Sequence, residues 1–167
     1  MEMEKVIFSW SGGKDSALAL YELQKTRKYE VSTLLTTITG EYDRISMHGV
    51  RSTLLEQQAR SLGFPLEKVA ISKNASNEEY QARMEITLAK FQGNGISSVV
   101  FGDIFLEDIR KYREEQLSKV GMRGLFPLWK RNTTNLSRTF VDLGFKAIVT
   151  CIDSRPVSYT HLTLPTN

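Results

Sequence analysis

The first candidate for chemistry in this sequence is the hexapeptide at residues 11–16, Ser-Gly-Gly-Lys-Asp-Ser. Adjacent glycines let the backbone adopt positive φ angles, so successive N–H groups can point into one concavity. A helix starting here adds free N–H groups and a partial positive charge, and Lys14 adds a full charge. Ser11 and Ser16 supply hydroxyl groups, while Asp15 is either the helix N-cap or a carboxylate facing Mg²⁺. The hexapeptide is therefore predicted to bind phosphate.

Two other interpretations of the hexapeptide remain open. The ordinary P-loop has a glycine five positions before its Gly-Lys pair and a Ser or Thr directly after the lysine. This chain has Phe8 and Asp15 at those positions, so cleavage of a terminal phosphate is not the favoured chemistry. The other interpretation is a Gly-Gly turn that opens a helix and binds nothing.

The elements around the hexapeptide are a strand and a helix. β-branched and aromatic residues predict a strand at 6–8, and Ala/Leu-rich helical spacing predicts a helix from residue 17. The alternation continues with strands at 31–38, 69–71, 98–101 and 147–151, and with helices at 50–62, 77–91, 106–117 and 134–143. It predicts an α/β fold whose parallel sheet of about five strands is covered on both faces.

Ligands of such sheets bind beyond the carboxyl ends of the strands. Four segments follow predicted strands and are expected to line one cleft: residues 11–16, 39–49, 102–103 and the loop at 124–129. Within the second segment, His48 precedes a helix. His48 either contacts the nucleotide or substrate, or packs at the helix entrance.

A second charged group follows Gly102 and Asp103. Arg110 lies one helical turn from both Arg113 and Glu114. Two guanidinium groups facing a cleft would bind a phosphate or carboxylate, but the same spacing is typical of a solvated helix face. Asp103, at a strand end beside a glycine, is the stronger functional candidate.

Composition narrows the class of protein. The 167 residues have a net charge of +3 and a pI near 9.0, with charges of both signs spread along the chain, so nucleic acid is not an expected partner. Cys151 is the only cysteine, which leaves no disulfide framework. No apolar run reaches membrane-spanning length, and the N-terminus does not resemble a signal peptide. The expected location is the cytoplasm, with no membrane partner.

The hexapeptide resembles the signature of the PP-loop ATP pyrophosphatase superfamily, whose members cleave ATP between the α and β phosphates. Residues 44–51, 102–104, 110–114, 127–129 and 144–147 together resemble the diphthine-ammonia ligase family within it. In that family ATP adenylates the carboxylate of diphthine, a modified histidine on elongation factor 2, and ammonia displaces AMP. The resemblance implies a HUP-type three-layer α/β/α sandwich, ATP and Mg²⁺ as ligands, and diphthine or a related acceptor.

The resemblance also implies roles for individual residues. ATP would be held by Ser11, Gly12, Gly13, Lys14, Asp15, Ser16, His48 and Gly102. The catalytic residues would be Lys14, Asp15 and Asp103. The acceptor side would be shaped by Arg110, Arg113 and Glu114, and Asp15 would bind any metal. Two alternatives stay open: another PP-loop enzyme, such as a tRNA-modifying one, and a nucleotide-binding module without catalysis.

The end of the chain has a separate interpretation. Residues 157–167 resemble the translation of a transposon-end adapter used in sequencing libraries and are expected to be a non-native tail. A genuine exposed tail that forms an edge strand is the alternative. The first interpretation leaves residues 1–156 as a PP-loop ATP-binding domain truncated at its C-terminal end, before a Gly-, Glu- and Asn-rich segment that contributes to the family's acceptor site.

Overall fold

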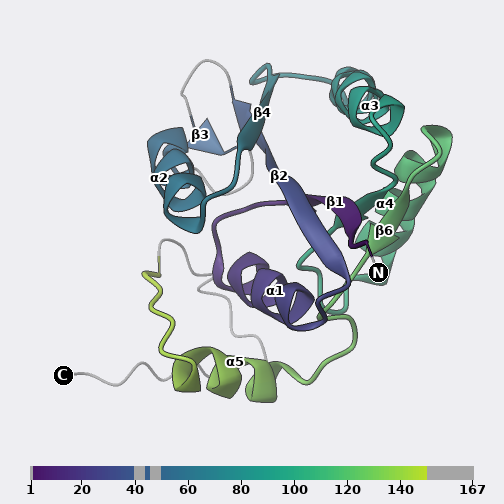
Figure 1. Ribbon diagram of the computed structural model, residues 1–167. Coiled ribbons are helices and arrows are strands. Elements are labelled where there is room, and N and C mark those ends of the chain that lie inside the picture. The colour runs from purple at the N-terminus through teal and green to yellow at the C-terminus, as the bar shows by residue number, and fades with distance from the viewer. Residues whose placement is uncertain (1, 40–43, 46–49, 150–167) are drawn as a thin grey trace.

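The structure is a computed structural model that describes residues 2–39, 44–45 and 50–149 (Figure 1). His48, most of the 39–49 segment, Cys151 and the 157–167 tail lie outside these residues. None of the helices in the described ranges is both long enough and apolar enough to cross a membrane.

Within the described residues, five parallel strands form the sheet, as the alternating pattern predicts. Their spatial order is β4 (Leu66–Ile71), β2 (Tyr29–Thr39), β1 (Glu4–Ser9), β5 (Ser98–Val100) and β6 (Arg123–Leu125). A two-residue strand, β3 (Arg44–Ile45), pairs antiparallel with the end of β2. The helices are α1 (Lys14–Lys25), α2 (Ser52–Leu62), α3 (Asn77–Gly93), α4 (Glu107–Lys119) and α5 (Thr133–Asp142).

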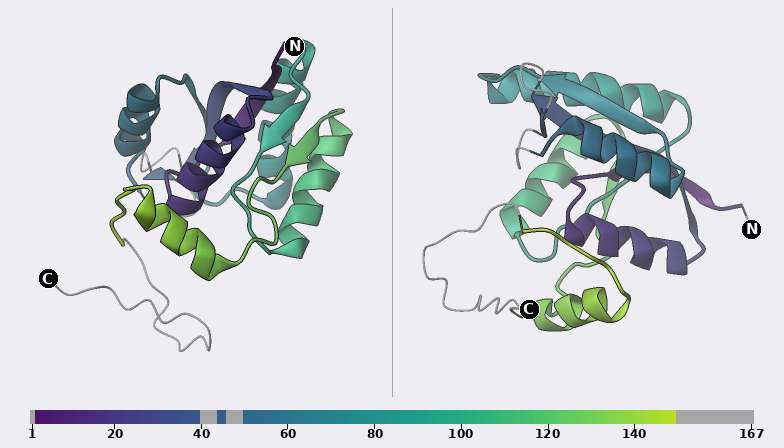
Figure 2. Two further views of the ribbon diagram at one scale, coloured as in Figure 1. Left: turned by 60° about the horizontal axis from the view of Figure 1, so that its bottom comes forward. Right: turned by 90° about the vertical axis from the view of Figure 1, so that its left-hand side faces the viewer.

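The helices cover both faces of the sheet and enclose two hydrophobic cores (Figures 1 and 2). Alternate residues of a strand point to opposite faces, so Val6 and Phe8 enter one core and Ile7 enters the other. The first core is closed by buried residues of α1, α2 and α5, and the second by Leu88 of α3 and Leu117 of α4. The three-layer α/β/α prediction is thus confirmed.

Two details of the sequence prediction are wrong. The fifth parallel strand is β6, within residues expected to begin a loop, whereas residues 147–149 have no strand structure. Arg-Gly-Leu has little strand preference of its own, and its pairing with β5 decides its conformation. Gly13, not Asp15, is the N-cap of α1. Asp15 instead lies in the first turn of α1, where the partial positive charge of the helix N-terminus stabilises its negative charge.

The amino ends of three strands are joined by a polar network. The Glu4 carboxylate of β1 accepts hydrogen bonds from the Ser98 hydroxyl of β5 and from the Arg123 guanidinium of β6, the latter at 2.8 Å. Arg123 also donates to the fully buried Ser98 hydroxyl at 3.0 Å. The hydrogen bond from Ser98, followed by Arg123, lowers the pKa of Glu4 against the opposing effect of partial burial. This network lies at the amino-terminal edge of the sheet, whereas the hexapeptide follows the carboxyl end of β1 at the opposite edge.

The network predicts an acid-sensitive contribution to stability. A lowered folded-state pKa stabilises the protein above the unfolded-state value near 4.5, and this contribution is lost as the pH falls through the folded-state pKa. We expect Glu4→Gln to lower the free energy of unfolding at pH 7 by about 1 kcal/mol or less, with a smaller difference at pH 3. Urea unfolding at both pH values measures this, and Glu30→Gln on the exposed side of β2 is the control. An equal difference at both pH values would contradict the assignment.

Candidate functional site

Residues 11–16 form a compact turn between β1 and α1. Gly12 has a φ of +74°, a conformation that residues with a side chain rarely adopt. The hydroxyl oxygens of Ser11 and Ser16 are 2.8 Å apart, and the Ser11 N–H donates to the Ser16 hydroxyl at 3.3 Å. These contacts close the turn, while the N-terminus of α1 provides free backbone N–H groups beside it.

The two charged side chains of the turn pair with each other. Lys14 Nζ lies 2.7 Å from Asp15 Oδ1, and the two side chains are 52% and 43% exposed. Ion pairs this exposed contribute about 1 kcal/mol or less. A bound anion or cation can therefore replace the pair at small cost.

Asp15 is also the predicted metal ligand. No group of three or more His, Cys, Asp or Glu side chains placed to hold a metal occurs among the described residues. Mg²⁺ bound with nucleotides typically takes one or two carboxylates and completes its shell with phosphate oxygens and water. A single exposed carboxylate beside a turn that is predicted to bind phosphate fits that pattern.

Gly102, at the carboxyl end of β5, lies directly against the turn. A Cβ atom at this position would be 3.1 Å from the carbonyl carbon and oxygen of Asp15 and from the Ser16 nitrogen. These neighbours are backbone atoms in the first turn of α1, which cannot move aside as a flexible side chain would. The absent side chain at Gly102 therefore permits the close approach of β5 and α1.

A cleft of about 410 Å³ opens at the carboxyl ends of β1, β2 and β5. Six predicted site residues line it: Ser11, Asp15, Ser16, Gly102, Asp103 and Arg113. The remaining predicted residues in the described ranges, Gly12, Gly13, Lys14, Arg110 and Glu114, are not part of its wall. His48 is outside the described residues.

Asp103 and Arg113 form an ion pair in the cleft wall. Arg113 Nε lies 2.7 Å from Asp103 Oδ2, and Arg113 Nη2 donates to Asp103 Oδ1 at 3.4 Å. The shorter contact is not aligned as a hydrogen bond, which leaves both of its atoms buried without a hydrogen-bond partner. The guanidinium of Arg113 also stacks on Phe101, 4.4 Å from the ring centre. Asp103 and Arg113 thus fix each other's position in the cleft wall, and Asp103 Oδ2 and Arg113 Nε can each still form a hydrogen bond.

Arg110 has different partners. Its Nε donates to Glu114 at 2.8 Å, as the helical spacing predicts. Its guanidinium carbon lies 4.6 Å from the ring centre of Phe126 and 4.7 Å from that of Trp129. Arg110 and Glu114 therefore hold the loop after β6 against α4.

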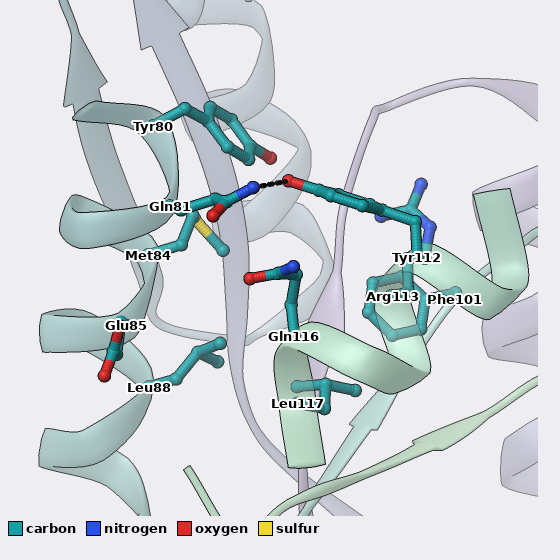
Figure 3. Close-up of a pocket in the computed structure, with 10 residues that line it drawn as sticks. All are labelled: Tyr80, Gln81, Met84, Glu85, Leu88, Phe101, Tyr112, Arg113, Gln116 and Leu117. Carbon is teal, nitrogen blue, oxygen red and sulfur yellow. Dashed lines mark hydrogen bonds between the residues drawn. The ribbon is translucent and has the colours of Figure 1, made fainter. Parts of the chain in front are cut away.

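A small side pocket of about 60 Å³ branches from the cleft between α3 and α4 (Figure 3). Tyr80 and Met84 line it from α3 and Tyr112 and Gln116 from α4, with the Gln81 amide donating to the Tyr112 hydroxyl at 3.3 Å. Its wall shares six residues with the cleft: Tyr80, Met84, Leu88, Phe101, Arg113 and Leu117. Burial, partly opposed by Arg113, raises the pKa of the Tyr80 phenol, so this hydroxyl stays neutral at physiological pH.

Sequence reasoning missed Trp10 and Gln58. Trp10 lines the cleft, and its indole N–H donates to the Gln58 side chain, which in turn donates to the Gly12 carbonyl. Trp10 directly precedes the hexapeptide, so its place in the sequence indicated that it would lie near the cleft. Gln58 lies 46 residues from Gly12 on a helix of ordinary amphipathic pattern, so the sequence held no sign of this contact.

Comparison with known proteins supports the fold. Among solved structures, the fold is similar to the U34-tRNA thiolase NcsA from Methanococcus maripaludis with its [4Fe-4S] cluster, with a TM-score of 0.55 at 15% sequence identity. The similarity covers 95% of this chain and 63% of the thiolase chain, and at this identity it shows the fold alone. No curated protein matches the chain.

The family comparison is more specific. Residues 4–124 match the family described as the diphthamide synthase N-terminal domain. These residues run from β1 to β6 and contain the hexapeptide, Gly102 and the Asp103–Arg113 pair. The match covers well over half of the 167 residues, and the chain therefore belongs to the diphthamide synthase N-terminal domain family.

Proposed function

We propose that the protein is an ATP-dependent, AMP-forming amide ligase that adenylates a carboxylate for attack by ammonia. The acceptor is diphthine on elongation factor 2 or a related carboxylate. The observation that supports this proposal most is that one cleft is lined by both the Ser11–Ser16 hydroxyl pair and the Asp103–Arg113 ion pair. One ligand can thus lie against the turn while a second reaches the ion pair.

In this proposal the turn binds the phosphates of ATP. The N–H groups at the start of α1, the two serine hydroxyls and the Lys14 ammonium are donors of the kind that phosphate oxygens accept. Lys14 leaves its exposed pair with Asp15 to stabilise charge that develops at the α phosphate. Asp15 then becomes free to bind Mg²⁺, which shields phosphate charge.

The acceptor side of the proposal rests on Asp103 and Arg113. A guanidinium binds a carboxylate through two parallel hydrogen bonds, and Arg113 has a buried Nε without an aligned partner. Binding of the acceptor carboxylate by Arg113 would release Asp103 to accept a proton from the attacking ammonia. The nitrogen forms the amide bond as the bond to AMP breaks. Arg110 and Glu114 support this side through the loop after β6.

Another PP-loop reaction, such as tRNA modification, is the second candidate, which the fold shared with the thiolase favours. The thiolase has a [4Fe-4S] cluster, and such clusters are held by several cysteine thiolates. These 167 residues contain only Cys151. Strong binding of tRNA that weakens with salt would support this candidate, and tight nucleotide binding without turnover would support a non-catalytic module.

Product analysis of labelled ATP separates these functions. The 167-residue chain is incubated with Mg²⁺, ammonium and candidate carboxylate acceptors, beside a chain in which the natural continuation replaces residues 157–167. That second chain tests the proposal that residues 1–156 are the native part of a longer domain. AMP and pyrophosphate that require an acceptor support the ligase, whereas ADP and phosphate contradict it.

Removing either charge of the turn is expected to slow AMP formation. Lys14→Ala and Asp15→Ala should each lower kcat/KM by at least about tenfold, because each removes a contact to the reacting phosphates or their metal. Lys28→Ala is the matched control, since Lys28 is exposed between the far end of α1 and the start of β2. Undiminished activity in both turn variants would contradict the assignment.

Arg113 is expected to affect the acceptor more than ATP. Arg113→Lys keeps the charge but loses the planar pair of donors, so the KM for the acceptor should rise about tenfold while the KM for ATP changes little. Steady-state kinetics with each substrate varied in turn measures this. Arg83→Lys, at a 51% exposed position of α3, is the control. An equal rise in both KM values would refute a role confined to the acceptor.

A further inference from the structure

The side chain of Gln58 ties the turn at residues 11–16 to α2. Its amide nitrogen donates to the Gly12 carbonyl oxygen at 3.2 Å, and its amide oxygen accepts from the Trp10 indole N–H at 3.0 Å. Trp10 is only 4% exposed, and Gln58 is half-buried. The chain Trp10–Gln58–Gly12 therefore links the wall of the cleft to the glycine turn.

Trp10 decides which way the Gln58 amide faces. An amide carries an acceptor oxygen and a donor nitrogen, so its two orientations have opposite hydrogen-bonding properties. The indole N–H can only donate, so the Gln58 oxygen must face Trp10 and the nitrogen must face Gly12. The Gly12 carbonyl consequently meets a donor.

This donor fixes the direction of the next N–H group. In a planar trans peptide, the Gly12 carbonyl and the Gly13 N–H point in opposite directions. Because Gln58 holds the carbonyl, the Gly13 N–H faces the other side, where the Ser11 hydroxyl lies 3.3 Å from its nitrogen. The Gly13 N–H donates to that hydroxyl, and because Gly13 is the N-cap of α1, this N–H has no acceptor within the helix.

Two adjacent glycines have no side chains to stabilise one peptide orientation over another. Gly12 already has a φ of +74°, and glycine populates both signs of φ about equally. The Ser11 hydroxyl holds the N–H of the Gly12–Gly13 peptide from inside the turn, and the Gln58 amide holds its carbonyl from outside.

We propose that Gln58, oriented by Trp10, is a positioning residue that fixes the peptide between Gly12 and Gly13 before the nucleotide binds. The inference rests on the proposed nucleotide site and not on the reaction that follows. Donors that are already aimed need no rearrangement when the phosphate arrives, which strengthens binding.

The decisive variant is Gln58→Glu, which keeps the shape of the side chain. A carboxylate still accepts from Trp10 but has no N–H group to donate to the Gly12 carbonyl. Gln57→Glu makes the same chemical change at the neighbouring exposed position of α2 and is the matched control. Trp10→Phe is a second variant, which removes the indole donor and leaves Gln58 in place.

The first measurement uses the free protein. Backbone ¹⁵N order parameters of Gly12 and Gly13 are expected to fall from roughly 0.85 in wild type to below roughly 0.6 in Gln58→Glu, with an intermediate fall in Trp10→Phe. Values for β1 should stay unchanged, which shows that the fold is intact. Unchanged values at Gly12 and Gly13 in both variants would overturn the inference.

The second measurement is the Kd for ATP with Mg²⁺, by calorimetry. We expect an increase of about tenfold in Gln58→Glu and little change in Gln57→Glu. Equal Kd values in these two variants would also overturn the inference. If wild type binds ATP but forms no AMP, the ligase proposal fails while this inference stands. If wild type does not bind ATP, the nucleotide site fails, and with it the inference.

Discussion

The close approach of two backbone segments is the constraint on which the site depends. The carboxyl end of β5 lies against the first turn of α1, and Gly102 allows this because it has no side chain to meet the Asp15 carbonyl. The same turn requires a positive φ at Gly12. With those two glycines in place, one cleft spans the ends of three parallel strands and brings the turn and the Asp103–Arg113 pair into one wall.

Sequence pattern predicts most of this arrangement because the signals are local. Apolar periodicity places the helices and four of the five parallel strands, and the strand–turn–helix order alone puts the hexapeptide at the carboxyl edge of the sheet. The Arg110–Glu114 pair likewise follows from helical spacing. By contrast, β6 depends on pairing with β5, and Arg113 finds its partner in Asp103, ten residues earlier and outside the helix.

The missed contacts share a physical origin. Gln58 is placed at the glycine turn by the packing of α2 against the sheet, in which Leu55 and Ala59 are buried in the core beneath the helix. From the sequence alone, the half-buried Gln58 on this helix cannot be distinguished from a polar residue on the surface. Its significance depends on a partner that can only donate, Trp10, and on a carbonyl that can only accept. Such complementarity exists only after the chain has folded.

The central position of β1 has a consequence for how the domain unfolds. Val6 and Phe8 belong to one core and Ile7 to the other, so a single three-residue run anchors both helix layers. Losing β1 would expose both cores together, and neither layer could persist alone on the sheet. β2 also contributes to both cores through Leu34 and Leu35, and β5 does so through Val100 and Val99. The two halves of the sandwich are thus coupled through the three central strands, and they are expected to melt in one cooperative transition rather than layer by layer.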